Sequence, residues 1–257
     1  MVSSRPVVLL TGLGREIGLG SAIATRLVTD GWDVAFVYSA AYDSRVNGGA
    51  GNTALIERKL RDLGGNTLGI DADLAESSEV MRIFDAAQSL GPVSALVLGH
   101  AESTSGGIIT TTVDSFDRHI AVNARASWLL IREFALRFTT RQDAIGIQIA
   151  GRIVGLTSDA IHNELSYGAS KGALDRTVFT AAREFAEAGI TANLVNPGPV
   201  DTGWMTDDVR QWVLERTPAG RGGRPTDTAA LVSFLLSSDA QWITGQLLKS
   251  DGGFSAP

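Results

Sequence analysis

Residues 11–24 read TGLGREIGLGSAIA, and this stretch decides the expected fold. Four glycines fall within nine positions, between the apolar run of residues 7–10 and a segment with helical periodicity. The strict pattern G-x-G-x-x-G is absent, because Ile17 and Ile23 stand where the third glycine belongs. A glycine-rich turn between a first strand and a first helix is nevertheless typical of loops that hold a pyrophosphate at the helix N-terminus. The alternative is a flexible turn without a ligand, because such motifs are weak signals when they stand alone.

Short apolar runs alternate with longer amphipathic segments along the rest of the chain. The apolar runs predict strands at residues 6–12, 33–39, 66–74, 93–99, 151–158, 190–198 and 245–253. The amphipathic segments predict helices at residues 21–31, 52–65, 77–91, 114–138, 166–188 and 226–237, with 114–138 either one long helix or a broken pair. Residues 40–51 are expected to form a long loop. Strands spaced by helices imply right-handed crossovers. The expected fold is therefore α/β, a three-layer, doubly wound Rossmann fold with a mainly parallel seven-stranded sheet, in one domain at residues 1–257.

The composition of the 257 residues excludes several classes of protein. The formal net charge of -6 argues against a nucleic-acid partner. The absence of cysteine excludes disulfides, thiolate nucleophiles and cysteine-based metal sites. His100, His119 and His162 show no metal-ligand spacing, so no metal is expected. No apolar run approaches membrane length, and residues 7–10 are too short for a signal peptide. We therefore expect a cytoplasmic protein that does not bind membranes.

The segment SYGASKGAL, residues 166–174, contains a second motif with chemical meaning. Tyr167 and Lys171 are four positions apart and therefore lie on one face of the predicted helix. A tyrosine with its ordinary pKa of about 10 is a poor acid or base at neutral pH, and a nearby cation lowers that pKa. We therefore predict that Lys171 activates Tyr167. The alternative is an unrelated surface pair, because Tyr-x-x-x-Lys also occurs by chance.

These features resemble the classical short-chain dehydrogenase/reductase family over nearly the whole chain. The resemblance includes DADL (71–74), Asn123 in HIAVNARASWLL, NPGPVDTG (196–203), GRGGRP (220–225) and ITGQLLKSDGG (243–253). The family pattern T-G-x-x-x-G-x-G matches the first loop when it is read back from the helix. Gly18 and Gly20 are then its last two glycines, and the arch before them carries two extra residues. The enlarged arch and the YSAAYDS segment are similar to a 3-oxoacyl-carrier-protein-reductase-like subgroup.

The resemblance implies an enzyme that interconverts a carbonyl and an alcohol with NAD(P)(H). It implies that Tyr167 transfers the proton and that Ser158 hydrogen-bonds the carbonyl oxygen. It also implies that Lys171 binds the nicotinamide ribose and that Asn123 helps to hold a water in a proton relay. Together with Tyr167 and Lys171, the implied cofactor-binding residues are Thr11, Gly12, Gly14, Arg15, Gly18, Leu19, Gly20, Ser39, Asp73, Leu74, Gly99, Ala101, Pro197, Gly198, Val200 and Thr202.

Two departures from the family pattern affect the expected site. The family has Asn-Asn-Ala-Gly after the fourth strand, whereas this chain has GHAE at residues 99–102. His100 and Glu102 therefore either face the cofactor or serve a structural role. The interval between Ser158 and Tyr167 is shorter than usual in the family, which makes Thr157 and Ser166 alternatives for the catalytic hydroxyl.

The segment after the second strand favours NADP(H) over NAD(H). In NAD enzymes an acidic residue near the end of this strand binds the 2′-hydroxyl of the adenosine ribose. Here the first acid, Asp43, comes several residues later. Arg15 is expected to meet a 2′-phosphate and Ser39 to hydrogen-bond it, with Arg45 as a further candidate.

Residues 202–220 are expected to form a lid over the substrate, with Trp204, Met205 and Trp212 against a ketone. The alternative is a surface helix that packs its aromatic residues on the core. The favoured function is reduction of a ketone or 3-oxoacyl-type carbonyl to a secondary alcohol, or the reverse, by a homotetramer or homodimer. A divergent enoyl reductase, whose Tyr and Lys are spaced more widely, and a non-catalytic dinucleotide-binding regulator are the alternatives.

Overall fold

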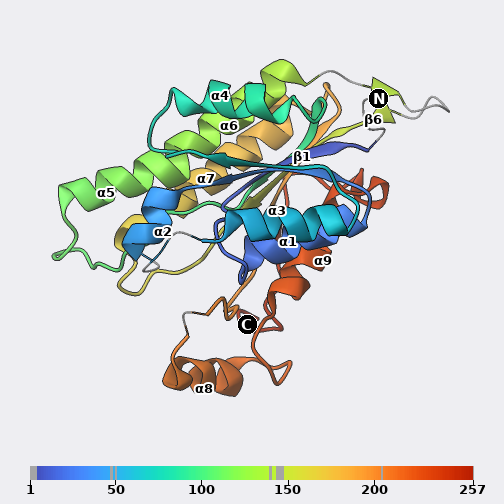
Figure 1. The fold of residues 1–257 in the computed structure, drawn as a ribbon. Helices are drawn as coiled ribbons and strands as arrows, with labels where there is room; N and C mark the ends of the chain where they lie inside the picture. The colour runs from blue at the N-terminus through green and yellow to red at the C-terminus, as the bar shows by residue number, and fades with distance from the viewer. Residues whose placement is uncertain are drawn as a thin grey trace.

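A seven-stranded parallel sheet forms the centre of the molecule (Figure 1). The computed structural model describes residues 5–46, 49, 51–138, 141–142, 148–203 and 205–256. The strands of the sheet are β1 (Val7–Thr11), β2 (Asp33–Tyr38), β3 (Thr67–Asp71), β4 (Val93–Leu98), β7 (Gly151–Leu156), β8 (Ile190–Asn196) and β9 (Leu247–Lys249). Their order across the sheet is β3-β2-β1-β4-β7-β8-β9, which confirms the predicted fold. The chain order reverses between β1 and β4, and such a reversal places a ligand crevice at the carboxyl ends of the two strands.

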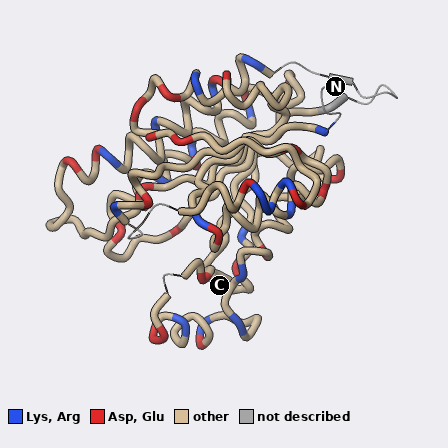
Figure 2. Tube along the Cα trace, in the orientation of Figure 1, with Lys and Arg blue, Asp and Glu red and all other residues tan. Residues whose placement is uncertain are grey.

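Helices cover both faces of the sheet (Figure 1). One layer contains α1 (Leu19–Thr29), α3 (Thr53–Asp62) and α9 (Pro225–Leu236), and the other contains α4 (Glu79–Ala87), α5 (Val113–His119), α6 (Ala126–Arg137) and α7 (Leu165–Glu184). Because both faces are covered, all six residues of β4 are buried, and apolar side chains point to both sides. Charged residues are sparse along the central strands and frequent on the outer helices (Figure 2). In the described part of the chain, no helix is long and apolar enough to cross a membrane.

The smaller elements lie outside these layers. Helix α8 (Asp207–Arg216) projects from the body, and a short 3-10 turn covers Ser238–Ala240 (Figure 1). Strands β5 (Arg141–Gln142) and β6 (Gln148–Ile149) form a separate antiparallel pair.

The segment predicted at residues 114–138 is continuous but changes its winding in the middle. A π-helical stretch, Ile120–Arg125, joins α5 to α6. The wider turn brings Asn123 and Val122 inward, where both are buried. Such π-helical turns are frequent at functional sites.

The expectation of a loop throughout residues 40–51 is wrong for its first half. Residues Ala40–Val46 form helix α2 directly after β2. The Ser39 hydroxyl accepts a hydrogen bond from the Tyr42 backbone N–H at 3.2 Å, which satisfies a first-turn donor and starts the helix. The consequence is that α2, rather than an irregular loop, lies beside the ligand crevice.

Candidate functional site

A cleft of about 570 Å³ opens at the carboxyl ends of β1, β2 and β4. Most of the predicted cofactor-binding residues line it: Gly12, Gly14, Arg15, Gly18, Leu19, Gly20, Ser39, Asp73, Leu74, Gly99, Ala101, Thr202 and the predicted catalytic Tyr167. Its volume lies within the range of ordinary small-molecule sites, which is about 300–1,000 Å³. Residues from six separate parts of the chain therefore line this one cleft.

The glycine stretch forms a cradle that no larger residue could form. Gly12 has a φ of 86°, and a side chain there would place Cβ 2.5 Å from the Gly99 carbonyl carbon. A Cβ on Gly20 would lie 2.6 Å from the Gly12 carbonyl oxygen. Gly18 is the N-cap of α1 and provides no side-chain cap, so the first turn of the helix keeps N–H groups for an anion. This cradle fits a dinucleotide pyrophosphate, which would contact the backbone of the loop and the start of α1.

Thr11 lies beneath the cradle and does not line the cleft. Its side chain is fully buried, and its Oγ1 is 2.6 Å from His100 Nδ1. His100 Nε2 lies 3.0 Å from the Val122 carbonyl oxygen, which can only accept, so Nε2 carries the proton and Nδ1 accepts from Thr11. The Thr11 side chain therefore links β1 to the segment after β4, and its contact with the cofactor stays a prediction.

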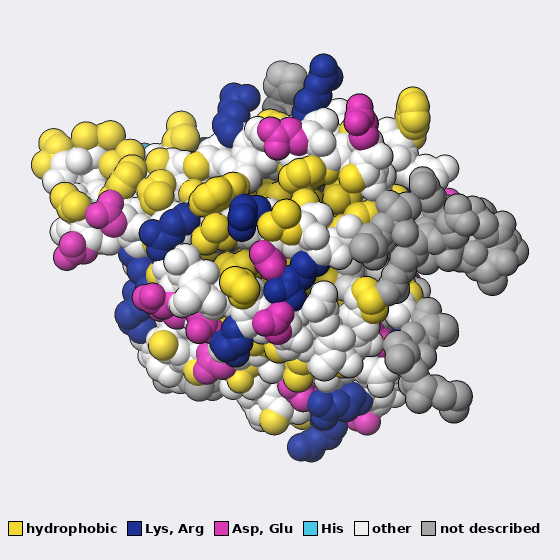
Figure 3. Space-filling view, turned by 90° about the horizontal axis from the view of Figure 1, so that it is seen from above, with side chains coloured by type: hydrophobic (Ala, Val, Ile, Leu, Met, Phe, Trp, Pro, Cys, Tyr) yellow, Lys and Arg dark blue, Asp and Glu magenta, His cyan; other side chains and the backbone are white. Residues whose placement is uncertain are grey.

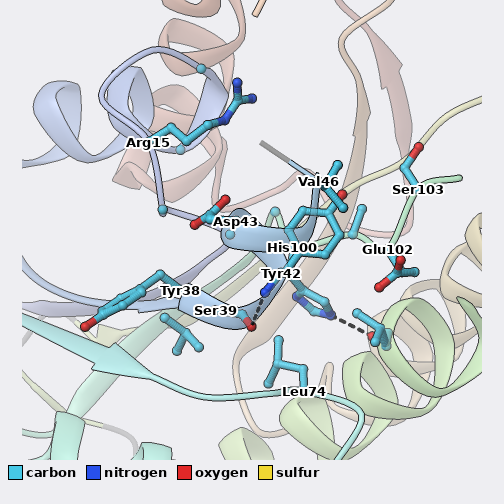
Figure 4. Close-up of a pocket in the computed structure, with 18 of the residues that line it drawn as sticks. Arg15, Tyr38, Ser39, Tyr42, Asp43, Val46, Leu74, His100, Glu102 and Ser103 are labelled. Atoms are coloured by element: carbon cyan, nitrogen blue, oxygen red, sulfur yellow. Dashed lines mark hydrogen bonds between the residues drawn. The ribbon is translucent and has the colours of Figure 1, made fainter. Parts of the chain in front are cut away.

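His100 is a neutral histidine in a fully enclosed position. Burial, with the nearby Lys171 cation, lowers the pKa of His100 to about 3, although its hydrogen bond to Val122 opposes that shift. The His100 ring is held by hydrogen bonds to Thr11 and Val122, and it also lines the cleft, where Figure 4 labels it, so both roles that the sequence left open stay open for it. His100 therefore stiffens the wall of the cleft.

Tyr167 and Ser158 meet at the wall of the cleft. Tyr167 is the third residue of α7, and Ser158 follows β7, where its Oγ accepts a hydrogen bond from the Ala160 N–H at 3.1 Å. Burial, together with the Glu164 carboxylate, raises the pKa of Tyr167 to about 12, and a hydrogen bond with Ser158 opposes the rise. Ser158 is thus the hydroxyl beside Tyr167, whereas the alternatives Thr157 and Ser166 are buried with exposures of 3% and 2%.

Lys171 lies one turn beyond Tyr167 and is almost completely buried. Its Nζ donates to the Leu156 carbonyl at 2.9 Å and lies 5.7 Å from the centroid of the Tyr167 ring. Burial lowers the pKa of Lys171 to about 8, and Asp175 opposes that shift. The predicted lowering of the Tyr167 pKa is wrong for the protein alone. Burial of the phenol raises this pKa, and the Lys171 ammonium donates its hydrogen bonds to backbone carbonyls rather than to the phenol.

The Asn123 side chain fixes the segment after β4. Its Oδ1 accepts from the Glu102 N–H at 2.7 Å, and its Nδ2 donates to the Glu102 carbonyl and the Ser170 hydroxyl, both at 2.9 Å. This amide therefore positions Glu102 in the wall of the cleft, and its part in a water relay stays a prediction.

Asp73 lies at the adenosine end of the predicted site. Its carboxylate accepts two hydrogen bonds from Arg118, at 2.9 and 3.0 Å. Partial burial favours the neutral carboxyl, but the bonds from Arg118 and the Ala75 N–H hold the pKa of Asp73 below its ordinary value. Asp73 is therefore a fixed anion at this end of the cleft.

Some predicted residues lie away from the cleft. Gly198, at a φ of 63°, packs its backbone on Asp251, Val200 pairs with Gly223, and Pro197 stands between β8 and this turn. Trp212 lies against Phe254 with ring centroids 5.4 Å apart and is 46% exposed. Among the described residues, neither Met205 nor Trp212 lines the cleft, and Trp204 lies outside the described residues. Their roles, as cofactor or substrate contacts, stay predictions.

Several residues that line the cleft were not predicted from the sequence as cofactor or substrate contacts, and four of them come from α2 and α5. Tyr42, Asp43 and Val46 come from α2 (Figure 4), and Arg118 comes from α5. The only local signal for α2 is Ser39 before two alanines, which is a helix-start pattern. Nothing in the local sequence indicates that the helix reaches the cleft.

Comparisons with known proteins agree with this geometry. Residues 12–255 match a family model described as enoyl-(acyl carrier protein) reductase. The chain is 35% identical to the uncharacterized oxidoreductase YjdA of Bacillus subtilis, with 98% of both proteins covered. It is 32% identical to the 3-oxoacyl-[acyl-carrier-protein] reductase MabA of Mycobacterium tuberculosis, with 96% of this chain and 91% of that protein covered. A solved blue fluorescent protein from a metagenomic library, in complex with NADPH, is 31% identical with a TM-score of 0.83, over 98% of both chains. The chain belongs to the short-chain dehydrogenase/reductase family and is an NAD(P)-dependent oxidoreductase.

Proposed function

We propose that the protein reduces ketones or 3-oxoacyl-type carbonyls to secondary alcohols and prefers NADP(H). The observation that carries the proposal is the group of Tyr167, Ser158 and Lys171 beside the same cleft as the glycine cradle. Carbonyl reduction requires a proton donor and a hydroxyl partner for the carbonyl oxygen, and here a buried cation lies one helical turn from the donor. The name of the similar mycobacterial reductase supports a 3-oxoacyl-type substrate.

The proposed mechanism assigns one task to each side chain. When bound, the reduced nicotinamide supplies a hydride to the carbonyl carbon. Tyr167 donates its phenolic proton to the carbonyl oxygen, and its raised pKa keeps the phenol protonated at neutral pH. Ser158 hydrogen-bonds the same oxygen and stabilises the charge that develops there. The Lys171 cation stabilises the phenolate that remains after the transfer.

A substrate screen tests this function. Purified protein with NADPH is offered ketones, 3-oxoacyl thioesters and enoyl thioesters, and consumption of NADPH is followed at neutral pH. Turnover of the carbonyl compounds alone supports the proposal. Turnover of enoyl thioesters alone favours the enoyl reductase, and binding of NADPH without any turnover favours the non-catalytic regulator.

The rate of reduction is expected to fall as the pH rises through about 8. Lys171, whose pKa is lowered to about 8 by burial, is a cation below that pH and neutral above it. Without the cation, the phenolate of Tyr167 loses its stabilisation, so proton donation slows. The measurement is kcat for ketone reduction from pH 6 to pH 10 at saturating NADPH. A profile that stays flat to pH 10 contradicts this role of Lys171.

Arg15 carries the proposed preference for NADP(H). It lines the cleft, and its Nη1 donates to the Thr202 carbonyl at 3.3 Å, which places the guanidinium at the rim of the cradle (Figure 4). For Arg15→Ala we expect KM for NADPH to rise about tenfold, because a charge-assisted hydrogen bond to phosphate is lost. KM for NADH should change much less, and equal effects on both cofactors would remove Arg15 from this role.

Self-association as a homodimer or homotetramer is also proposed. A groove between α6 and α7 exposes Trp128 and Leu136, at 51% and 66% of their surfaces. Figure 3 looks onto this helical layer and shows apolar side chains between charged ones. Both side chains belong to α6, and large exposed apolar groups on one face are typical of a subunit interface.

A further inference from the structure

Helix α2 crosses the cofactor cleft from one wall to the other. On one side, the Asp43 carboxylate lies so close to Gly14 that a side chain at Gly14 would collide with it. On the other side, Arg45 Nη2 donates to both carboxylate oxygens of Glu102, at 2.7 and 2.8 Å. Tyr42 and Val46 line the cleft between these two contacts (Figure 4). The helix therefore rests on the glycine loop and is fastened to the segment after β4.

The Glu102 end of this connection is a rigid anchor. The side chain of Glu102 is 2% exposed, and its backbone is held on both sides by the Asn123 amide. Arg118 Nε lies 3.3 Å from Glu102 Oε2 and ties it to Asp73. Arg45, in contrast, keeps 49% of its side chain exposed. The ion pair thus joins a buried carboxylate to an exposed guanidinium at the end of α2.

The base of α2 is fastened as well. The Ala40 N–H donates to Asp71 Oδ1 at 3.1 Å, and Ser39 caps the first turn. The helix therefore has a fixed beginning on β2 and β3 and a fastened far end at Glu102. The Arg45–Glu102 pair is the ion pair that fastens this far end.

The cleft stays open beneath the helix. The cavity of about 570 Å³ exists while Arg45 and Glu102 are paired, and it runs from the glycine cradle to Tyr167. A plug would fill this space, whereas α2 only covers it.

We propose that α2 is a strap that controls the exchange of the dinucleotide, and that the Arg45–Glu102 ion pair is its clasp. The proposal rests on the cofactor site of the proposed function but not on any substrate. If the Arg45–Glu102 pair is formed in both the free and the NADPH-bound protein, it raises the activation barrier to association and to dissociation of NADPH equally. Its loss speeds association and dissociation together and leaves the dissociation constant nearly unchanged.

Stopped-flow fluorescence of NADPH binding tests the strap. Association and dissociation rates are measured for the wild type, Arg45→Gln, Glu102→Gln and the double variant. Both rates should rise about fivefold in Arg45→Gln, which is the size expected for an ion pair with one exposed partner. Kd should stay within about twofold. The rates of the double variant should match those of the single variants, because each single substitution already removes the whole Arg45–Glu102 ion pair. The matched control is Arg26→Gln, which removes the Arg26–Asp30 pair on α1 at a similar exposure and should leave both rates unchanged.

Three results overturn the clasp. A rise of the dissociation rate alone, with a weaker Kd, makes Arg45 a direct ligand of the cofactor. A rise of the association rate alone, with a tighter Kd, makes α2 a plug. Unchanged rates in Arg45→Gln show that α2 does not limit exchange of NADPH. Because Arg45 is half exposed, this variant tests the proposal even if Glu102→Gln fails to fold. A protein that binds NADPH with these kinetics but turns over no carbonyl substrate refutes the proposed function and leaves the strap intact.

Discussion

Replacement of Tyr167 by phenylalanine is expected to lower kcat for ketone reduction by about 10³-fold, as loss of a general acid does in other enzymes. The variant removes one hydroxyl from the wall of the cleft and keeps the ring. No other described side chain combines a dissociable proton, a place in the cleft and contact with Ser158. The dissociation constant for NADPH should stay within about threefold, because the cradle is untouched. Steady-state rates and fluorescence titration of NADPH give the two quantities.

The control for this variant is Tyr38→Phe. Tyr38 also lines the cleft, at the end of β2, but its ring packs near Phe36 with centroids 6.2 Å apart. The same loss of a hydroxyl there should leave kcat within about twofold, since no proton transfer is assigned to it. Unchanged ketone turnover in Tyr167→Phe would defeat the proposed proton donor.

Acid is expected to destabilise the protein through His100. The pKa of His100 is lowered to about 3 in the folded protein, whereas an unfolded histidine titrates near 6.5. Between these values the unfolded chain binds a proton that the folded chain excludes, so stability falls as the pH falls. From pH 6.5 to pH 4 the wild type should lose about 3 kcal/mol of unfolding free energy through this group alone.

His100→Asn isolates that contribution, because asparagine does not titrate. Urea unfolding at pH 6.5 and pH 4 gives the change in unfolding free energy for each protein. The loss should be about 3 kcal/mol smaller in the variant than in the wild type. His162→Asn is the control, since His162 is exposed and its replacement should leave the wild-type loss unchanged. Equal losses in wild type and His100→Asn would show that His100 takes up a proton in the folded protein.

The sequence was sufficient for the features that depend on local geometry. Alternating apolar runs and amphipathic segments predicted the seven strands of the sheet and the long helices between them, though not the short α2, because burial on both faces of a parallel sheet leaves this pattern. The spacing of Tyr167 and Lys171 placed both on one face of α7, because neighbours four positions apart share a helix face. The glycines of the cradle were recognised because only glycine permits the close approach of Gly20 to Gly12.

Contacts between distant segments could not be predicted in this way. Arg45 and Glu102 are 57 positions apart, and Thr11 and His100 are 89 apart, so no local pattern connects them. The raised pKa of Tyr167 also depends on burial, which only the packed structure determines. Periodicity thus predicted most of the elements, and the motifs with the family resemblance they carry predicted the chemical groups of the site. Tertiary packing decided which groups are desolvated, which are paired and what covers the cleft, because those properties depend on distances through space rather than along the chain.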